Sequence, residues 1–186
     1  MRSLHPINFT AVVVSLVTLA WAGYLAANSG GRVGVCESAN GCNCHSSNPN
    51  DNGDVTVSIT GPQDVQVGTT NSYTISVTGG PAGTTGGYNL CASDGTLIPG
   101  TGSEESQGEL THTNQNNRSW TFEWTAPGSE TVASFTAVGM SSDDDGTGGD
   151  SWNWFGGSAG TGFDITVTAT VPTKPITWGK LKKQYQ

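Results

Sequence analysis

The chain has 186 residues, 27 of them glycine, and a formal net charge of −8 at pH 7. This length suits one domain with short appendages. All 15 acidic residues lie between Glu37 and Asp164, where Arg118 is the only cation. Such a stretch repels phosphate, so the composition excludes a nucleic-acid-binding protein and is simplest to explain as a well-solvated acidic surface.

Residues 1–27 are predicted to be a signal peptide or a membrane anchor. Arg2 precedes an apolar run from Phe9 to Ala27, and the small residues of "AWAG" suit signal peptidase. The run is also close to the ~20 residues that span a bilayer, so an uncleaved anchor is the alternative. Either form predicts an extracytoplasmic protein, whether secreted, periplasmic or on the cell surface. In that setting cysteines are more often bonded than free.

Residues 28–53 carry three of the four cysteines and His45. Cys42, Cys44 and His45 form C-x-C-H, one residue shorter than the C-x-x-C-H signature of covalent haem attachment. With one intervening residue, an extended chain would send the two sulfurs to opposite sides. A single thioether through Cys44, with His45 as the iron ligand, is still chemically allowed.

A second iron ligand would have to come from few residues, because the exported part has one further histidine and one methionine, His112 and Met140. For His112, a role in a hydrogen-bond network at a strand edge is the favoured interpretation. For Met140, packing at a strand end is favoured.

Disulfides are the alternative use of the cysteines, which are Cys36, Cys42, Cys44 and Cys91. A bond between Cys42 and Cys44 would close a strained ring, so an all-disulfide form pairs each of them with Cys36 or Cys91. A mixed form keeps Cys44 for haem and bonds Cys36 to Cys91 or Cys42. Zinc held by Cys36, Cys42, Cys44 and His45 has suitable ligand types but an unusual spacing. The residues alone leave the haem and disulfide forms open.

Residues 54–171 alternate apolar and polar side chains, which predicts β-strands. The alternating segments are 54–60, 72–78, 87–93, 119–125, 132–138 and 163–171, and a shorter strand is expected at 108–113. Glycine, proline, asparagine and aspartate clusters separate them. About seven strands with one apolar face each predict an all-β, immunoglobulin-like antiparallel β-sandwich, because two sheets must cover each other's apolar faces.

Two glycine- and acid-rich stretches, 99–109 and 140–162, are predicted to be loops. The second carries four aspartates that are candidate Ca²⁺ ligands, Asp143, Asp144, Asp145 and Asp150. Of the aromatic residues that follow, Trp152, Trp154 and Phe155, two are expected in the core and one is expected to be exposed for partner contact. Residues 172–186, with four lysines, are predicted to be a disordered basic tail.

Several segments together resemble choice-of-anchor V domains, which are bacterial surface domains related to the reeler domain of reelin and spondin proteins. Between Gly31 and Phe155 they are "GRVG", "GGYNL", "ELTHT", "SWTFEWTAP", "SFTAVGM" and "GGDSWNWF". The resemblance implies a reelin-like β-sandwich on an exported protein without catalytic activity. Many members carry C-x-x-C-H where Cys42 to His45 lie, which implies one covalently bound haem. Here Gly41 stands at the place of the first cysteine.

No nucleophile elbow, phosphate loop or zinc-protease motif is present, so an enzyme is not expected. Two functions are predicted as alternatives. One is a monohaem module for electron transfer or redox sensing, which would need a redox partner. The other is a non-catalytic, disulfide-stapled module, assisted by Ca²⁺ in one form, that binds an extracellular matrix or cell-surface ligand.

Overall fold

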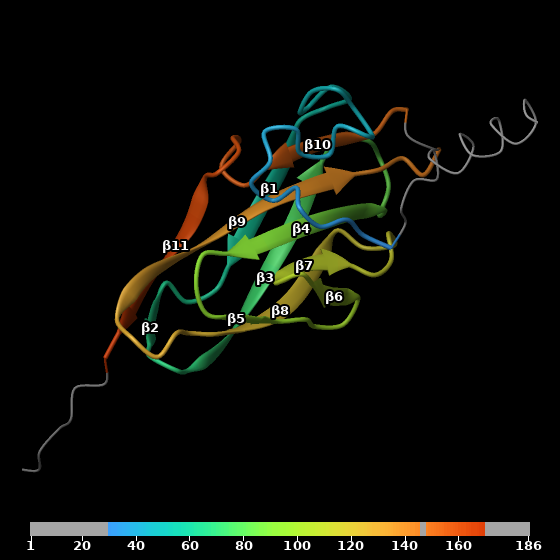
Figure 1. Ribbon diagram of the computed structural model, residues 1–186. Helices are drawn as coiled ribbons and strands as arrows, with labels where there is room; N and C mark the ends of the chain where they lie inside the picture. The colour runs from blue at the N-terminus through green and yellow to red at the C-terminus, as the bar shows by residue number, and fades with distance from the viewer. Residues whose placement is uncertain (1–29, 146–147, 170–186) are drawn as a thin grey trace, which may run out of the picture.

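The computed structural model describes residues 30–145 and 148–169, and all regular secondary structure in these residues is β (Figure 1). The strands are β1 (Val55–Thr60), β2 (Asp64–Gln66), β3 (Thr70–Gly79), β4 (Gly86–Ala92), β5 (Thr96–Ile98), β6 (Ser103–Ser106), β7 (Glu109–His112), β8 (Ser119–Thr125), β9 (Thr131–Ser141), β10 (Ser151–Trp154) and β11 (Gly162–Thr168). The predicted all-β sandwich is confirmed. The predictions for residues 1–27 and 172–186 concern parts of the chain outside the described residues.

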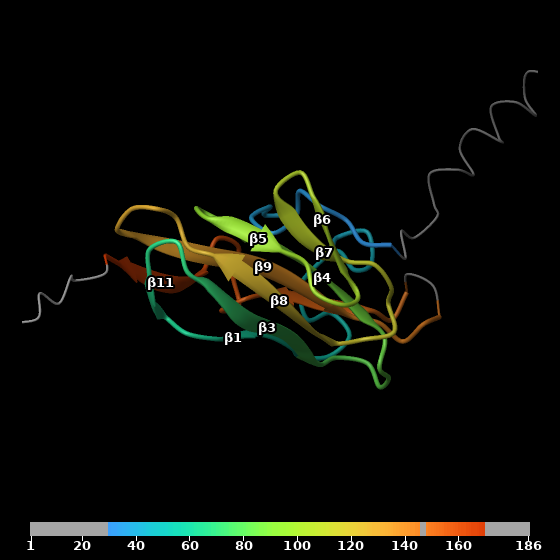
Figure 2. The same cartoon turned by 90° about the horizontal axis from the view of Figure 1, so that it is seen from below.

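Two sheets make up the sandwich, as the two views in Figures 1 and 2 show. The smaller has the order β1-β3-β8-β5, and the larger has the order β2-β11-β9-β4-β7-β6, with β10 also paired to β9. The pairing is antiparallel except between β2 and β11. In the part of the chain that the structure describes, no helix is long and apolar enough to span a bilayer.

The sequence predicted about seven strands, and the structure has eleven in the described residues. Four strands were therefore not expected. They are β2, β5, β6 and β10, each of three or four residues. The stretches 99–109 and 140–162, predicted to be loops, contain β6 and β10, and β9 extends to Ser141. So short a strand shows too little alternation to be recognised, and it forms because a longer neighbour supplies the backbone partners.

The interior is built from the faces that the alternation predicts. In β1, for example, Val55, Val57 and Ile59 are buried while the residues between them are less covered. Phe135 lies at the centre of an aromatic cluster, with ring centroids 5.0 Å from Tyr73 and 5.4 Å from Trp124. Since the aromatic side chains of both sheets meet there, the cluster joins the two layers.

A second, smaller apolar cluster lies on the other face of the larger sheet. Val138 and Met140 of β9 alternate with the residues that face the interior, and with Val35 and Trp152 they form this cluster. Residues 31–53, here called the outer layer, cover it (Figure 1). This layer contains the C-x-C-H motif and is held to the sheet by polar contacts as well as by this apolar cluster.

Candidate functional site

The outer layer begins with a segment that is tied to β4 and β7. Asn89, 1% exposed, accepts backbone N–H bonds from Val35 and Cys36 at 3.0 and 2.8 Å. Its amide group donates to the carboxylate of Glu109 and to the carbonyl of Leu110. All donors and acceptors of this buried amide are therefore used, so Asn89 determines where the segment lies on the sheet.

A disulfide joins Cys36 of this segment to Cys91 of β4 and closes a loop across 55 positions of sequence. This is one of the two pairings expected for the mixed form. The all-disulfide form is not found, because Cys42 and Cys44 are free thiols. The physical reason is the Asn89 anchor, which places the backbone of Cys36 over β4 next to Cys91.

Consecutive turns carry the chain from Ser38 to His45, with i to i+3 backbone hydrogen bonds that include Gly41 N–H to Ser38 C=O and His45 N–H to Cys42 C=O. The chain is therefore bent here rather than extended, yet the two sulfurs still lie in different environments. Cys42 lies against the second apolar cluster, whereas Cys44 is exposed. Burial raises the pKa of the Cys42 thiol to about 12, so it stays protonated at neutral pH.

Gly41 is required where the C-x-x-C-H pattern would place its first cysteine. Its φ of +46° is in the left-handed region, and a Cβ there would overlap the ring of Trp152. A cysteine at this position is therefore incompatible with the packing of Trp152 in this chain.

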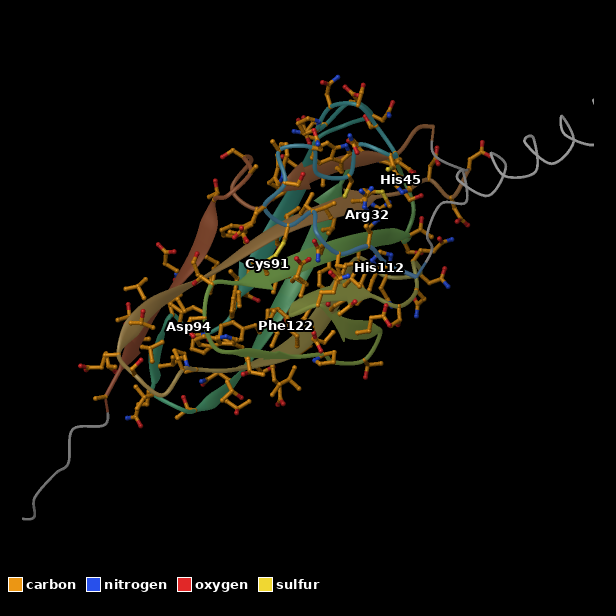
Figure 3. The ribbon with its side chains drawn as sticks, viewed as in Figure 1. Arg32, His45, Cys91, Asp94, His112 and Phe122 are labelled. Atoms are coloured by element: carbon orange, nitrogen blue, oxygen red, sulfur yellow. A yellow bond between two sulfur atoms is a disulfide. The ribbon has the colours of Figure 1, made fainter. Side chains whose placement is uncertain are left out.

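Cys44 lies beside the one exposed guanidinium of the outer layer. Arg32 Nη1 is 3.0 Å from Cys44 Sγ. Figure 3 labels Arg32 and, near it, His45, which follows Cys44 in the chain. Arg32 is held in turn through its backbone N–H, which donates to Thr111 of β7. Sequence reasoning did not identify Arg32, because its distance from Cys44 along the chain carries no motif.

His45 is fixed by a carboxylate from the far end of the chain. His45 Nδ1 lies 2.6 Å from Asp150 Oδ2, and the Asp150 side chain is 0% exposed. The other carboxylate oxygen accepts the backbone N–H of Asp143. A carboxylate accepts hydrogen bonds, so Nδ1 is the donor of this bond, and Nε2 makes no hydrogen bond to any described residue. This is the arrangement in which proteins hold histidines that ligate a metal.

The predicted Ca²⁺ site is not assembled in this structure. The Asp150 carboxylate is taken up by His45 and faces inward. Asp143 and Asp144 bond to a neighbouring backbone amide and to Gln115 respectively. Among the described residues, Asp143, Asp144, Asp145 and Asp150 do not bring three carboxylates within ligating distance of one another. The four aspartates are close in sequence but not in space, because the side chain of Asp150 is buried under His45.

Zinc binding by Cys36, Cys42, Cys44 and His45 is not supported either. The one group of potential ligand atoms that converges in the described ranges consists of Cys36, Cys91 and Glu109. Its two sulfurs are joined in the disulfide and so do not act as thiolate ligands.

His112 occupies the strand-edge position that was favoured for it. The backbone N–H of Tyr88 lies 3.2 Å from His112 Nδ1, shorter than the 3.4 Å between that nitrogen and the Tyr88 carbonyl. The residue is 8% exposed, and its ring lies near Trp120. Burial lowers the pKa of His112, with a smaller lowering from nearby His45. His112 is therefore a buried neutral acceptor within the sheet.

Met140 is 9% exposed and belongs to the second apolar cluster beneath the outer layer. This agrees with the packing role favoured for it. Trp152 is buried, and Trp154 and Phe155 are partly buried, so the expectation of one exposed aromatic among the three is wrong. The indole N–H groups of both tryptophans donate to backbone carbonyls of the outer layer, at Ser46 and Ser38.

An open depression of about 410 Å³ borders the site. Its lining includes Gly31, Arg32, Glu104, Ser106 and Thr111. It is open and polar, and neither Cys44 nor His45 is among its lining residues.

Comparisons with known proteins add little. No family model matches the sequence, and no curated protein matches it. Among solved structures, a CARDB domain of the PF1109 protein from Pyrococcus furiosus, crystallised in complex with di-metal ions, has a TM-score of 0.33 and 16% sequence identity. The match covers 63% of this chain and 96% of that chain. Nothing about the function of this chain follows from a similarity of this size.

Proposed function

We propose that the chain is an exported, reelin-like β-sandwich that carries one c-type haem, attached through Cys44 and ligated by His45. The observation that carries the proposal is the bond between His45 Nδ1 and the buried carboxylate of Asp150, which leaves Nε2 free beside an exposed cysteine. A histidine ligand whose other nitrogen is bonded to a carboxylate is the common arrangement in metalloproteins.

The side chains in the outer layer fit a haem with one thioether bond and not one with two. Cys44 is exposed and its sulfur contacts Arg32, so this sulfur is accessible for a covalent bond. Cys42 is turned toward the second apolar cluster, and Gly41 leaves no room for a cysteine. When bound, the group would supply one-electron redox chemistry, and the protein would tune it through the iron ligand and the solvent exposure.

Each residue has a distinct role in this proposal. Cys44 holds the group covalently, and His45 provides the imidazole ligand. Asp150 keeps the His45 ring in one orientation, and Arg32 contacts the sulfur of Cys44. The disulfide between Cys36 and Cys91 stabilises the layer on which these groups lie.

The test is to express the full chain with its leader in a bacterial host that has haem-attachment machinery. The pyridine haemochrome spectrum and the intact mass of the purified protein are then measured. We expect one covalent haem in the wild type and in Cys42→Ala, and none in Cys44→Ala. A colourless wild-type protein whose mass includes no haem would overturn the proposal and favour the disulfide-stapled adhesion module.

A further inference from the structure

The disulfide between Cys36 and Cys91 lies on the outer face of the larger sheet, between β7 and β9. Cys91 belongs to β4, which pairs with β9 on one side and with β7 on the other (Figure 3). Cys91 is partly exposed, whereas Cys36 is 3% exposed. A thiolate that approaches this bond from solvent therefore reaches the sulfur of Cys91 first.

The carboxylate of Glu109 lies on the β7 side of the disulfide. One oxygen of Glu109 and the two sulfurs of the disulfide lie within 4.8 Å of one another. Glu109 Oε2 accepts the backbone N–H of Gly34 at 2.7 Å and the side-chain amide of Asn89 at 2.9 Å. These two hydrogen bonds hold the carboxylate in place, so a negative charge lies beside the sulfurs.

A second carboxylate lies on the β9 side. Thr136 of β9 is the register partner of Cys91, and its hydroxyl donates to Oε1 of Glu37 at 3.2 Å. Partners in an antiparallel pair share a face of the sheet, so the Glu37 carboxylate lies on the same face as Cys91. Arg32, the cation in the same segment of the outer layer, contacts Cys44 instead. The surroundings of the disulfide are therefore acidic on both sides.

We infer that Glu109 protects the disulfide from reduction by anionic low-molecular-weight thiols and so keeps the outer layer attached in their presence. In the first step a thiolate attacks Cys91 Sγ, the bond between the two protein sulfurs breaks, and its electron pair leaves on Cys36 Sγ. A second thiolate then attacks the mixed disulfide and releases Cys91 as a thiolate. The two protein sulfurs are thus reduced and take up protons from water, and the two small thiols are oxidised to their own disulfide.

The physical reason is the charge that the first step brings next to Glu109. The attacking thiolate carries a negative charge toward the carboxylate, and the electron pair that leaves on Cys36 places another beside it. Repulsion from Glu109 therefore slows the step, and it slows the step most for a thiol that carries a further negative charge. The inference concerns the disulfide alone and does not depend on the proposed haem.

The test compares the rates at which a cationic thiol, cysteamine, and an anionic thiol, 3-mercaptopropionate, reduce the disulfide in the full chain. Free thiols are blocked first, and newly released thiols are counted from the mass that a second alkylating reagent adds. Each rate is divided by the thiolate concentration. We expect cysteamine to react faster with the wild type, and the ratio of the two rates to fall about fivefold in Glu109→Gln at low salt. Glutamine keeps an oxygen that accepts the bonds from Gly34 and Asn89, so this variant removes the charge and leaves an acceptor.

Two further variants separate this charge effect from a loosening of the outer layer. Glu104→Gln removes the same charge from β6, outside the group formed by Glu109 and the two sulfurs, and should leave the ratio unchanged. Asn89→Ala removes the acceptor for Val35 and Cys36 and should accelerate both thiols alike. The inference is wrong if Glu109→Gln accelerates both thiols alike or changes neither rate. It is also wrong if Glu104→Gln lowers the ratio as much as Glu109→Gln does.

Discussion

The interior of the sandwich and its outer layer are held together by different forces. Around Phe135, aromatic and aliphatic side chains from both sheets pack into a cluster whose buried members are at most 9% exposed. The outer layer buries only the small second apolar cluster, and it is also attached through the polar side chains of Asn89 and Asp150, two tryptophan N–H groups and one disulfide. Apolar packing is non-directional and follows from composition and alternation. A polar attachment depends on the few atoms that pair, so it can place chemical groups accurately but cannot be recognised from a pattern.

The largest effect on the free energy of unfolding is expected from a substitution in the interior of the sandwich. Phe135→Ala removes the ring that contacts Tyr73 and Trp124 and should lower the free energy of unfolding by about 4 kcal/mol. Urea unfolding followed by tryptophan fluorescence measures this change. Val132→Ala is the control, because Val132 is 63% exposed in the same strand, and it should have almost no effect. Equal costs for the two variants would contradict the assignment of Phe135 to the centre of the core.

Removal of the disulfide tests the strongest attachment of the outer layer. The double variant Cys36→Ser/Cys91→Ser should lose about 3 kcal/mol, because the bond no longer restricts the unfolded chain. The measurement is the urea midpoint under non-reducing conditions, with Cys44→Ser as the control, since Cys44 is exposed. Peptide mapping that found Cys42 or Cys44 linked to Cys36 or Cys91 would show that the pairing is wrong.

A substitution at Asn89 should destabilise the outer layer and leave the interior of the sandwich unchanged. Asn89→Ala leaves the backbone amides of Val35 and Cys36 without their acceptor and should cost about 2 kcal/mol. Hydrogen exchange measured by mass spectrometry should accelerate in residues 31–36 and stay slow in β3 and β8. Asn43→Ala, at an exposed position of the same layer, serves as the control. Uniform acceleration throughout the chain would mean that the layer and the interior unfold as one unit.

The smallest effect concerns the pH dependence of stability. Burial lowers the pKa of His112 below its usual value, so the unfolded chain takes up a proton at this residue first as the pH falls. Stability from this residue is therefore present above pH ~6.5 and is lost as the pH falls toward the lowered pKa. The urea midpoint of the wild type should fall more steeply between pH 7.5 and pH 5 than that of His112→Gln. Parallel profiles would contradict the buried, neutral state of His112.

The sequence was sufficient for the interior. Alternation located seven of the strands and placed Trp120, Phe122 and Trp124 on one buried face, as observed. It failed for β6 and β10, which pair with longer neighbours and have little pattern of their own. The four aspartates were assigned to one calcium site because they are close in sequence, yet Asp150 is turned inward toward His45.

The sequence by itself determined the class of the fold, because the period of two forces each strand to bury one face and therefore requires two sheets. It also determined that Cys44 and His45 are neighbours. Only the tertiary structure decided that Arg32 contacts the first and Asp150 the second, and that His112 and Met140 are occupied within the sheet and its apolar cover. These contacts join residues up to 105 positions apart. Such pairs leave no local signal, since their geometry exists only after the strands have paired and the outer layer has been placed.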